Sequence, residues 1–259
     1  MLRANILRVR PTPVAALDPD TVDAMWRLYD AHYDNVTRDG FERDLAEKTL
    51  VFLGTDAATG QVVGFSTALF YVHPEGERPV GVYFSGDTII HPRYWGQHAL
   101  HRAVVATLVR WKLRHPLTPL YWYLICSGYR TYLTLVRNFP DHWPRHDRPT
   151  PAPAARLLDA ISRARYGDAW KADRGVISFG GAQPVLKQAV APFTRQVLAL
   201  PEVGFFVKAN PGCLEGDELA MLARVNAAAV AGMAAKWLRR SLQRKPGLEP
   251  VQAVPRPAQ

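Results

Sequence analysis

The first 140 residues switch between strand-type and helix-type spacing of their apolar positions. Short apolar or alternating runs, typical of strands, occupy residues 4–10, 50–55, 62–72, 80–90 and 119–127. Helical spacing occupies residues 18–33, 37–49 and 128–139, and a further helix carries Leu100, Val104, Leu108 and Trp111. Three strands joined by short turns, then a strand–helix–strand crossover, predict a mixed, mostly antiparallel sheet with flanking helices, an α/β (α+β) fold.

The pattern changes after residue 140. Residues 141–153 combine proline with charge, which predicts a linker or a surface loop. The remainder predicts helices near 154–169, 183–199 and 214–243, and strands at 175–179 and 203–208. We therefore expect a core at 1–140, the linker at 141–153, a helical and mixed C-terminal extension packed on the core at 154–245, and a disordered tail at 246–259.

Charge and composition narrow the classes of partner. The 259 residues carry a formal net charge of +9, which attracts phosphates, nucleic acids and acidic membrane surfaces. No helix-turn-helix, zinc-finger or RNA-binding signature is visible, so a nucleic-acid partner is not expected. Two isolated cysteines and the lack of a signal-type or membrane-spanning apolar run predict a cytoplasmic protein. The basic amphipathic segment 236–245 is either a solvated helix end or a peripheral membrane contact.

The loop that follows the strand at 80–90 is a candidate anion site. A helix amino terminus presents unpaired N–H groups and partial positive charge, and glycine allows the backbone to approach a phosphate closely. Gly96 lies in this loop, and Arg93, His98, His101 and Arg102 place basic side chains nearby. The loop therefore predicts a pyrophosphate site; the alternative is a helix that merely starts after a solvated loop.

Residues 93–98 of this loop resemble the phosphate loop of the GNAT superfamily of acyl-CoA-dependent N-acyltransferases. That loop has the pattern (Arg/Gln)-x-x-Gly-x-(Gly/Ala): Arg93 and Gly96 match it, whereas His98 takes the place of the small residue and Ala99 follows one place later. The order of elements over residues 4–139 is also similar to the GNAT order. The donor-binding residues that the resemblance implies are Thr88, Ile89, Ile90, Arg93, Trp95, Gly96, Gln97, His98 and Ala99.

The resemblance also implies an activity and a GNAT-like fold. The protein would be an acyltransferase that moves an acyl group from a thioester donor, acyl-CoA or acyl carrier protein, to an amine acceptor by direct attack. The acceptor would be a small molecule or a lipid amine, and no metal is required; the spacing of His142 and His146 fits no known metal site. The alternative is a non-catalytic GNAT-like module that binds acyl-CoA or a partner protein.

Gly86 and Asp87 interrupt the apolar strand at 80–90, which predicts a bulge or a close backbone approach. In GNAT proteins a bulge at this place opens a cleft for the pantetheine arm of the donor. Asp87 is therefore expected either to take a proton from the attacking amine or only to satisfy backbone N–H groups of the bulge.

The segment after the strand at 119–127 is expected to serve the leaving thiolate. GNAT enzymes use a tyrosine five residues before a Gly-Phe pair; counting back from Phe139 and its preceding Asn138 reaches Thr134, so the neighbouring Tyr132 becomes the candidate acid. The competing interpretation packs Tyr132 in the core. Ser127 is expected to hydrogen-bond the thiolate or to cap the strand end, and Cys126 to be inert core.

Acceptor specificity in GNAT proteins comes largely from the first two helices and from C-terminal additions. The candidate acceptor-binding residues are Tyr29, His32, Tyr33 and Tyr129. Aromatic residues at helical spacing are also common in cores, so packing is the alternative role for these side chains.

Overall fold

The structure is a computed structural model that describes residues 5–74, 78–180, 185–186, 193–233 and 235. Within these residues, nine strands form one sheet. In the order of the sheet they are β1 (Leu7–Pro13), β3 (Leu50–Asp56), β4 (Val62–His73), β5 (Val80–Ile90), β6 (Leu120–Cys126), β11 (Glu218–Arg224), β9 (Val176–Ile177) and β8 (Trp170–Lys171), while β7 (His142–Trp143) also pairs with β11. The β5–β6 pair is parallel, and the other pairs of the described sheet are antiparallel.

The described residues form seven α-helices with defined bounds and three short 3-10 helices. They are α1 (Pro19–His32), α2 (Arg38–Ala46), α3 (Ala99–Arg114), α4 (Tyr129–Val136), α5 (Ala152–Tyr166), α6 (Arg195–Leu198), α7 (Pro201–Ala209), η1 (Val14–Ala16), η2 (Pro92–Tyr94) and η3 (Gly167–Ala169). Residues 227–233 are also helical, and β2 (Tyr33–Asp34) pairs with β10 (Val185–Leu186) in a small separate sheet.

Local sequence signals fix the starts of the first two helices. The Asp18 carboxylate accepts a hydrogen bond from the Thr21 backbone N–H at 2.8 Å, and Pro19 occupies the first helical position of α1. The Thr37 hydroxyl caps α2 by accepting from the Gly40 N–H at 3.1 Å. Both helices precede the β3–β4–β5 meander, and the element order predicted through residue 139 is confirmed apart from the additional two-residue strand β2 and the short 3-10 helices.

Helices cover both faces of the sheet. On one face, α3, α4 and α7 pack on a cluster that includes Leu124 of β6 and Met221 of β11. On the other face, α5 packs on Tyr123 of β6 and Leu222 of β11, and α1 and α2 cover the β3–β4–β5 side. Adjacent residues of a strand point to opposite faces, so the two helical layers lie on opposite sides of the sheet.

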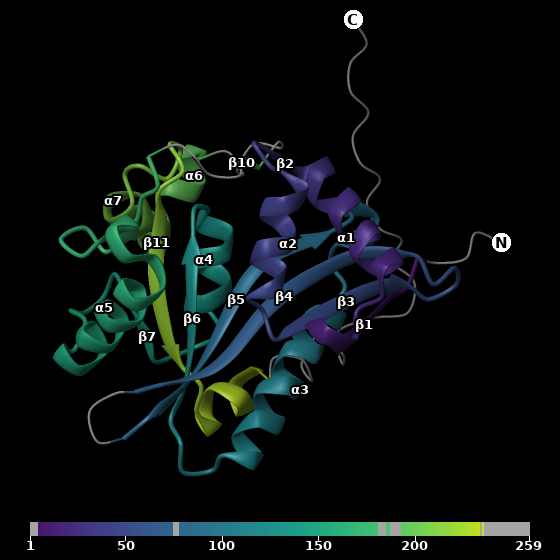
Figure 1. Cartoon of the computed structure of the whole chain (residues 1–259). Coiled ribbons are helices and arrows are strands. Elements are labelled where there is room, and N and C mark those ends of the chain that lie inside the picture. The colour runs from purple at the N-terminus through teal and green to yellow at the C-terminus, as the bar shows by residue number, and fades with distance from the viewer. Residues whose placement is uncertain (1–4, 75–77, 181–184, 187–192, 234, 236–259) are drawn as a thin grey trace, which may run out of the picture.

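The strands β5 and β6 separate at the centre of the sheet (Figure 1). Their ladder ends at the pair Phe84↔Tyr123, although β6 continues to Cys126 and β5 to Ile90. The register of β4 and β5 shifts between Ser66 and Ala68, so that two residues of β5, Gly86 and Asp87, lie opposite one of β4. The expected bulge is therefore present, and it turns β5 away from β6.

Gly86 allows this bulge to pack closely. A Cβ atom at this position would lie 2.3 Å from Oγ1 of Thr67 and 3.1 Å from Cε of Lys48. No side chain larger than hydrogen fits without moving these neighbours, which explains the glycine beside Asp87.

The second half of the chain departs from the sequence prediction. Residues 203–208 lie in the helix α7 instead of a strand, and residues 218–224 form the strand β11 instead of helix. The expected linker contributes β7. Of the expected helix at 183–199, residues 185–186 form the strand β10 and 195–198 form α6, while 183–184 and 187–192 lie outside the described residues. Because β11 pairs along β6, the C-terminal extension completes the central sheet as well as packing on the core.

Part of the prediction lies outside the described residues. This applies to the amphipathic segment 236–245 and to the tail 246–259. Among the helices that the structure describes, none is long and apolar enough to cross a membrane.

Candidate active-site cavity

A cavity of about 1560 Å³ lies where β5 and β6 separate. Its walls come from both helical layers of the molecule. On one side they include His98, His101, Val104, Arg130, Thr131 and Arg137 of the α3 and α4 region; on the other side they include Tyr29, Tyr33, Asp44, Glu47, Lys48, Arg165 and Tyr166. Ser85, Asp87, Thr88, Trp122, Ser127 and Glu218 line it from the sheet. The cavity therefore continues from one face of the sheet to the other through the gap between the strands.

The side facing α3 and α4 is basic. His98 precedes α3 and His101 lies in its first turn, with their rings 6.1 Å apart. Arg130 and Arg137 line the same side from α4 and its end. Together with the partial positive charge at the start of α3, these side chains favour an anion.

The loop before α3 has a positive backbone φ angle at Gly96. Its φ is +79°, in the left-handed region that favours glycine, and a Cβ atom there would have no neighbour within 4 Å. Trp95 is 61% exposed and donates its indole N–H to the Ile90 carbonyl at 2.7 Å, which folds the loop back on the end of β5. The open side of the loop can therefore be approached by a ligand.

Only some of the expected donor-binding residues face the cavity. Thr88 and His98 line it. The remaining residues of that set are not among its lining residues: Ile89, Ile90, Arg93, Trp95, Gly96, Gln97 and Ala99. Gln97 accepts from the Leu7 N–H and donates to the Asn5 carbonyl, both at 2.8 Å, so its side chain fastens the start of β1. Ile89 packs under α1 and α2, and Ala99 is buried beside Tyr94.

Two of the three expected catalytic residues meet at the cavity. Asp87 reaches it from the bulge of β5, and Ser127 from the end of β6. Tyr132 lies elsewhere: its side chain is fully buried, and its ring packs 5.5 Å from that of Phe206 in α7. Its hydroxyl is buried without a hydrogen-bond partner among the described residues, and burial raises its pKa.

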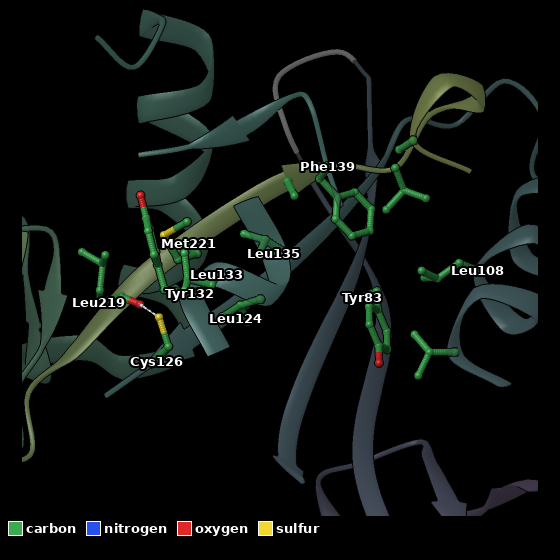
Figure 2. Packing of buried hydrophobic residues seen from close by; sticks show 14 of the residues in the cluster. Tyr83, Leu108, Leu124, Cys126, Tyr132, Leu133, Leu135, Phe139, Leu219 and Met221 are labelled. Atoms are coloured by element: carbon green, nitrogen blue, oxygen red, sulfur yellow. Dashed lines mark hydrogen bonds between the residues drawn. The ribbon is translucent and has the colours of Figure 1, made fainter. Parts of the chain in front are cut away.

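Figure 2 shows Tyr132 within the apolar cluster, beside Met221. Cys126 lies in the same cluster, where its thiol donates to the Leu219 carbonyl at 3.6 Å and burial raises its pKa. This surrounding corresponds to the packing alternative for Tyr132 and to the expected core position of Cys126. On α4, the hydroxyl-bearing residues Thr131 and Thr134 line the cavity instead, and the Thr134 hydroxyl donates to the Arg130 carbonyl at 2.9 Å.

The expected acceptor-binding residues divide in the same way. Tyr29 and Tyr33 line the cavity, with ring centroids 4.8 Å apart. His32 instead contacts the Leu28 carbonyl through Nδ1 at 2.7 Å, and Tyr129 is buried against Phe193 at 5.3 Å between ring centroids. Tyr29 at the end of α1 and Tyr33 directly after it thus contribute aromatic rings to the wall on this side.

The side of the cavity under α2 and α5 carries charges of both signs. The Lys48 ammonium is buried and bonds the Asp44 carboxylate at 2.5 Å and the Asp44 carbonyl at 3.0 Å. The Arg165 guanidinium lies 4.1 Å from the centroid of the Phe84 ring and pairs with Glu47 at 3.4 Å. Lys48 and Arg165 therefore each form an ion pair with an acidic side chain, Asp44 and Glu47 respectively.

Two more carboxyl groups lie on this side of the sheet. The pKa of Asp87 is raised to about 6: loss of hydration is the largest cause, the nearby Asp44 also raises it, and Lys48 lowers it. Loss of hydration and the charge of Asp87 raise the pKa of Glu218 to about 8. Both side chains are partly exposed because they border the cavity, yet protein surrounds them on the other sides, which is why their charged forms are disfavoured.

Glu218 was not identified as a site residue from the sequence, because it lay within a predicted helix. The turn before β11 fixes its position: the Asn210 amide donates to the Asp217 carbonyl at 2.8 Å, and Arg174 pairs with the Asp217 carboxylate at 3.2 Å. Glu218 stands two residues before Ala220 and four before Leu222, so strand spacing puts it on the same buried face as these apolar residues. This spacing was the sequence signal that could have identified Glu218 as a site residue.

Metal binding finds no support in the described part of the chain. Within those residues, no group of three or more His, Cys, Asp or Glu side chains could hold a metal ion. His142 is buried, and its Nδ1 contacts the Phe139 carbonyl at 2.6 Å.

Comparison with known proteins gives matches among solved structures only. No protein-family model and no curated protein matches the chain. A conserved protein of unknown function from Enterococcus faecalis matches with 15% identity and a TM-score of 0.39, over 50% of this chain and 31% of its own length. This chain thus spans less than two thirds of that protein.

Two further matches are complexes with CoA. A GNAT family N-acetyltransferase from Escherichia coli matches with 17% identity and a TM-score of 0.34, over 54% of this chain and 77% of that protein. An aminoglycoside N-acetyltransferase matches with 16% identity and a TM-score of 0.36, over 53% of this chain and 88% of that protein. The GNAT-like fold rests on the observed element order and on the parallel β5–β6 pair, which are those predicted from the sequence.

Proposed function

We propose that this protein is an acyltransferase that moves an acyl group from a thioester donor to an amine by direct attack. The observation that carries the proposal is the cavity through the gap between β5 and β6. It is basic on the α3 and α4 side, and on the other side it is bordered by two carboxyl groups that have no ion-pair partner among the described residues. A donor with phosphates and an acceptor with an amino group would approach each other from opposite faces of the sheet. Their reacting atoms would meet beside Asp87 and Ser127.

The donor half suits coenzyme A. Its pyrophosphate would bind at the start of α3, near Gly96, His98 and His101. Its pantetheine amides would pair with the backbone of β5 beyond Phe84, where the ladder with β6 has ended. An acyl carrier protein would present the same pantetheine arm on a protein surface. A binding measurement with each donor is therefore needed to distinguish the two.

The reacting groups follow from this placement. Backbone N–H groups near the bulge would polarise the thioester carbonyl. Asp87 would take a proton from the amine, directly or through water, because its raised pKa still leaves it ionised at neutral pH. Ser127, at the end of β6, would donate a hydrogen bond to the departing thiolate.

Thermal unfolding with a panel of ligands tests the donor site. The panel contains CoA, acetyl-CoA, medium- and long-chain acyl-CoA, an acyl carrier protein, and ATP as a phosphate control. A specific donor at about 100 times its Kd adds about 2.7 kcal/mol and raises Tm by roughly 5–10 °C. A shift with CoA species that ATP does not reproduce supports the proposal. No shift with either class of donor would contradict it.

Gly96→Glu is expected to weaken CoA binding by about tenfold or more. The new carboxylate would stand beside the phosphates, and repulsion of about 1.4 kcal/mol is enough for a factor of ten. Gly60→Glu is the matched control: Gly60 has a φ of +74°, equally open surroundings and a place in the β3–β4 turn, away from the cavity. Calorimetric titration of both variants with CoA gives the comparison. Equal affinity in both variants would remove the loop from the donor site.

The burial of Tyr132 favours the alternative, a non-catalytic GNAT-like module that binds acyl-CoA or a partner protein. Such a module would show donor-dependent stabilisation without release of thiol from acyl-CoA in the presence of any amine. Thiol release with an amine excludes it.

A further inference from the structure

Asp87 and Glu218 lie on the same face of the sheet, on opposite sides of β6. Glu218 shares the face of Ala220 and Leu222, which pack under α5, and Asp87 shares the face of Ile89, which packs under α1 and α2. Neighbouring strands are about 4.8 Å apart, so β5 and β11, on either side of β6, are roughly 10 Å apart before the bulge widens the gap. The two carboxyl groups therefore border the cavity with space between them.

Within the part of the chain that the structure describes, neither carboxyl group forms an ion pair or a hydrogen bond with another side chain. The bases on this side, Lys48 and Arg165, are paired with Asp44 and Glu47. An unpaired carboxylate in a confined site is costly, and the cost falls when a cation binds between such groups. The charge of this side of the cavity is therefore complementary to a positively charged ligand.

The same region offers aromatic walls. Tyr29 lies in the last turn of α1, Tyr33 follows that helix in β2, and Tyr166 is the last residue of α5. Burial raises the pKa of all three hydroxyls; the charges of Asp87 and Glu218 raise those of Tyr29 and Tyr33 further, and Glu218 acts on Tyr166 as well. All three tyrosines are thus neutral at neutral pH, and their rings can contact a cation or the apolar body that carries it.

We propose that Glu218 holds the ammonium group of the acceptor together with Asp87, so that a strand outside the predicted core selects acceptors that arrive as cations. The inference rests on the proposed function. Glu218 is the specificity-determining carboxylate, and Asp87, nearer the gap between β5 and β6, is the base. The strand β11 lies outside the first 140 residues, and Glu218 gives it a role in the reaction.

The proton balance of the step is complete without a further reactant. An ammonium acceptor loses one proton to Asp87, and the neutral amine attacks the thioester carbonyl. The new C–N bond forms and the C–S bond breaks. A second proton passes from the nitrogen to the departing thiolate, which leaves as the thiol, and Asp87 returns its proton to water.

Steady-state kinetics with matched amines test the inference. The donor is the acyl-CoA that stabilises the protein most, and thiol release is the signal. The acceptors are benzylamine, phenethylamine and putrescine, which are cations at neutral pH, and aniline, which is neutral. The wild type is compared with Glu218→Gln, Glu218→Asp and the control Glu215→Gln, an exposed acid on the preceding turn.

Turnover is expected with at least one cationic amine. Glu218→Gln should raise the KM for that amine by about tenfold or more with a smaller change in kcat, because it removes one charged partner and leaves the base. Glu218→Asp should restore part of the affinity, and Glu215→Gln should match the wild type. The rate with aniline should respond little to Glu218→Gln.

Three results would overturn the inference. The first is an unchanged KM in Glu218→Gln. The second is an equal loss of activity in Glu218→Gln with aniline and with the cationic amines. The third is thiol release with aniline only, or with none of the four amines. In each case CoA binding by calorimetry separates the two levels: if CoA still binds, the donor site stands and only the role of Glu218 is lost. If neither CoA nor an acyl carrier protein binds, the proposed function itself fails.

Discussion

Asp87→Asn is expected to lower kcat by about 10²- to 10⁴-fold, the range typical of a lost general base. The amide has nearly the shape of the carboxyl group, so the bulge of β5 should persist. The wild-type rate should rise with pH around the Asp87 pKa of about 6, since only the carboxylate accepts a proton. The variant should lack this rise, and the measurement is kcat and kcat/KM against pH.

Two comparisons make the result specific. Donor binding by Asp87→Asn should equal that of the wild type, because the base lies on the acceptor side of the reacting carbon. Asp173→Asn, at an exposed position that does not line the cavity, should keep wild-type kinetics. If Asp87→Asn retains its kcat and the pH dependence, Asp87 only serves the bulge, as in the structural alternative.

The sequence was sufficient for the first half of the fold. In residues 1–140, strands alternate clearly with helices, and caps such as Asp18 mark the boundaries. The interruption of an apolar strand by Gly86 and Asp87 predicted the bulge, while the cleft beside it was expected from the resemblance to GNAT proteins. Each of these features is local, so a short stretch of sequence contains the information that determines it.

The second half depends on contacts between distant residues. The strand β11, with sequence ELAMLAR, consists mainly of residues that favour helices, yet it pairs with β6 from Leu219↔Cys126 to Arg224↔Tyr121. Burial between two strands outweighs a propensity difference of less than about 1 kcal/mol per residue. Glu218 was therefore assigned to the wrong kind of element, and its proximity to Asp87 was not predictable.

The position of Tyr132 has a related cause. Helical spacing gives the face of α4 on which a side chain lies, but not which neighbour covers that face. Here α7, which was predicted to be a strand, packs on it with Phe205 and Phe206. The cavity side of α4 is left to Thr131 and Thr134. The error in the second half of the fold thus became an error in the site.

Glu218→Gln should stabilise the unliganded protein at alkaline pH and leave its stability unchanged at acid pH. The pKa of Glu218 is about 8 in the folded protein against 4.5 as an ordinary value, so the folded wild type binds more protons than the unfolded chain between these limits. Its free energy of unfolding therefore falls as pH rises through that window. Below it the carboxyl is protonated in both states, and above it the folded state carries the full cost of the charge.

The difference between Glu218→Gln and wild type should reach on the order of 3–4 kcal/mol above the window, or roughly 10 °C in Tm. Thermal unfolding near the two ends of the window measures it, with Glu215→Gln as the control that should show no such trend. A stabilisation that is equal at both ends would mean that Glu218 is not buried as a charge. A pH-dependent difference that shrinks when a cationic amine is added would connect this destabilising carboxyl to the acceptor, because a bound ammonium offsets the cost that the empty cavity imposes.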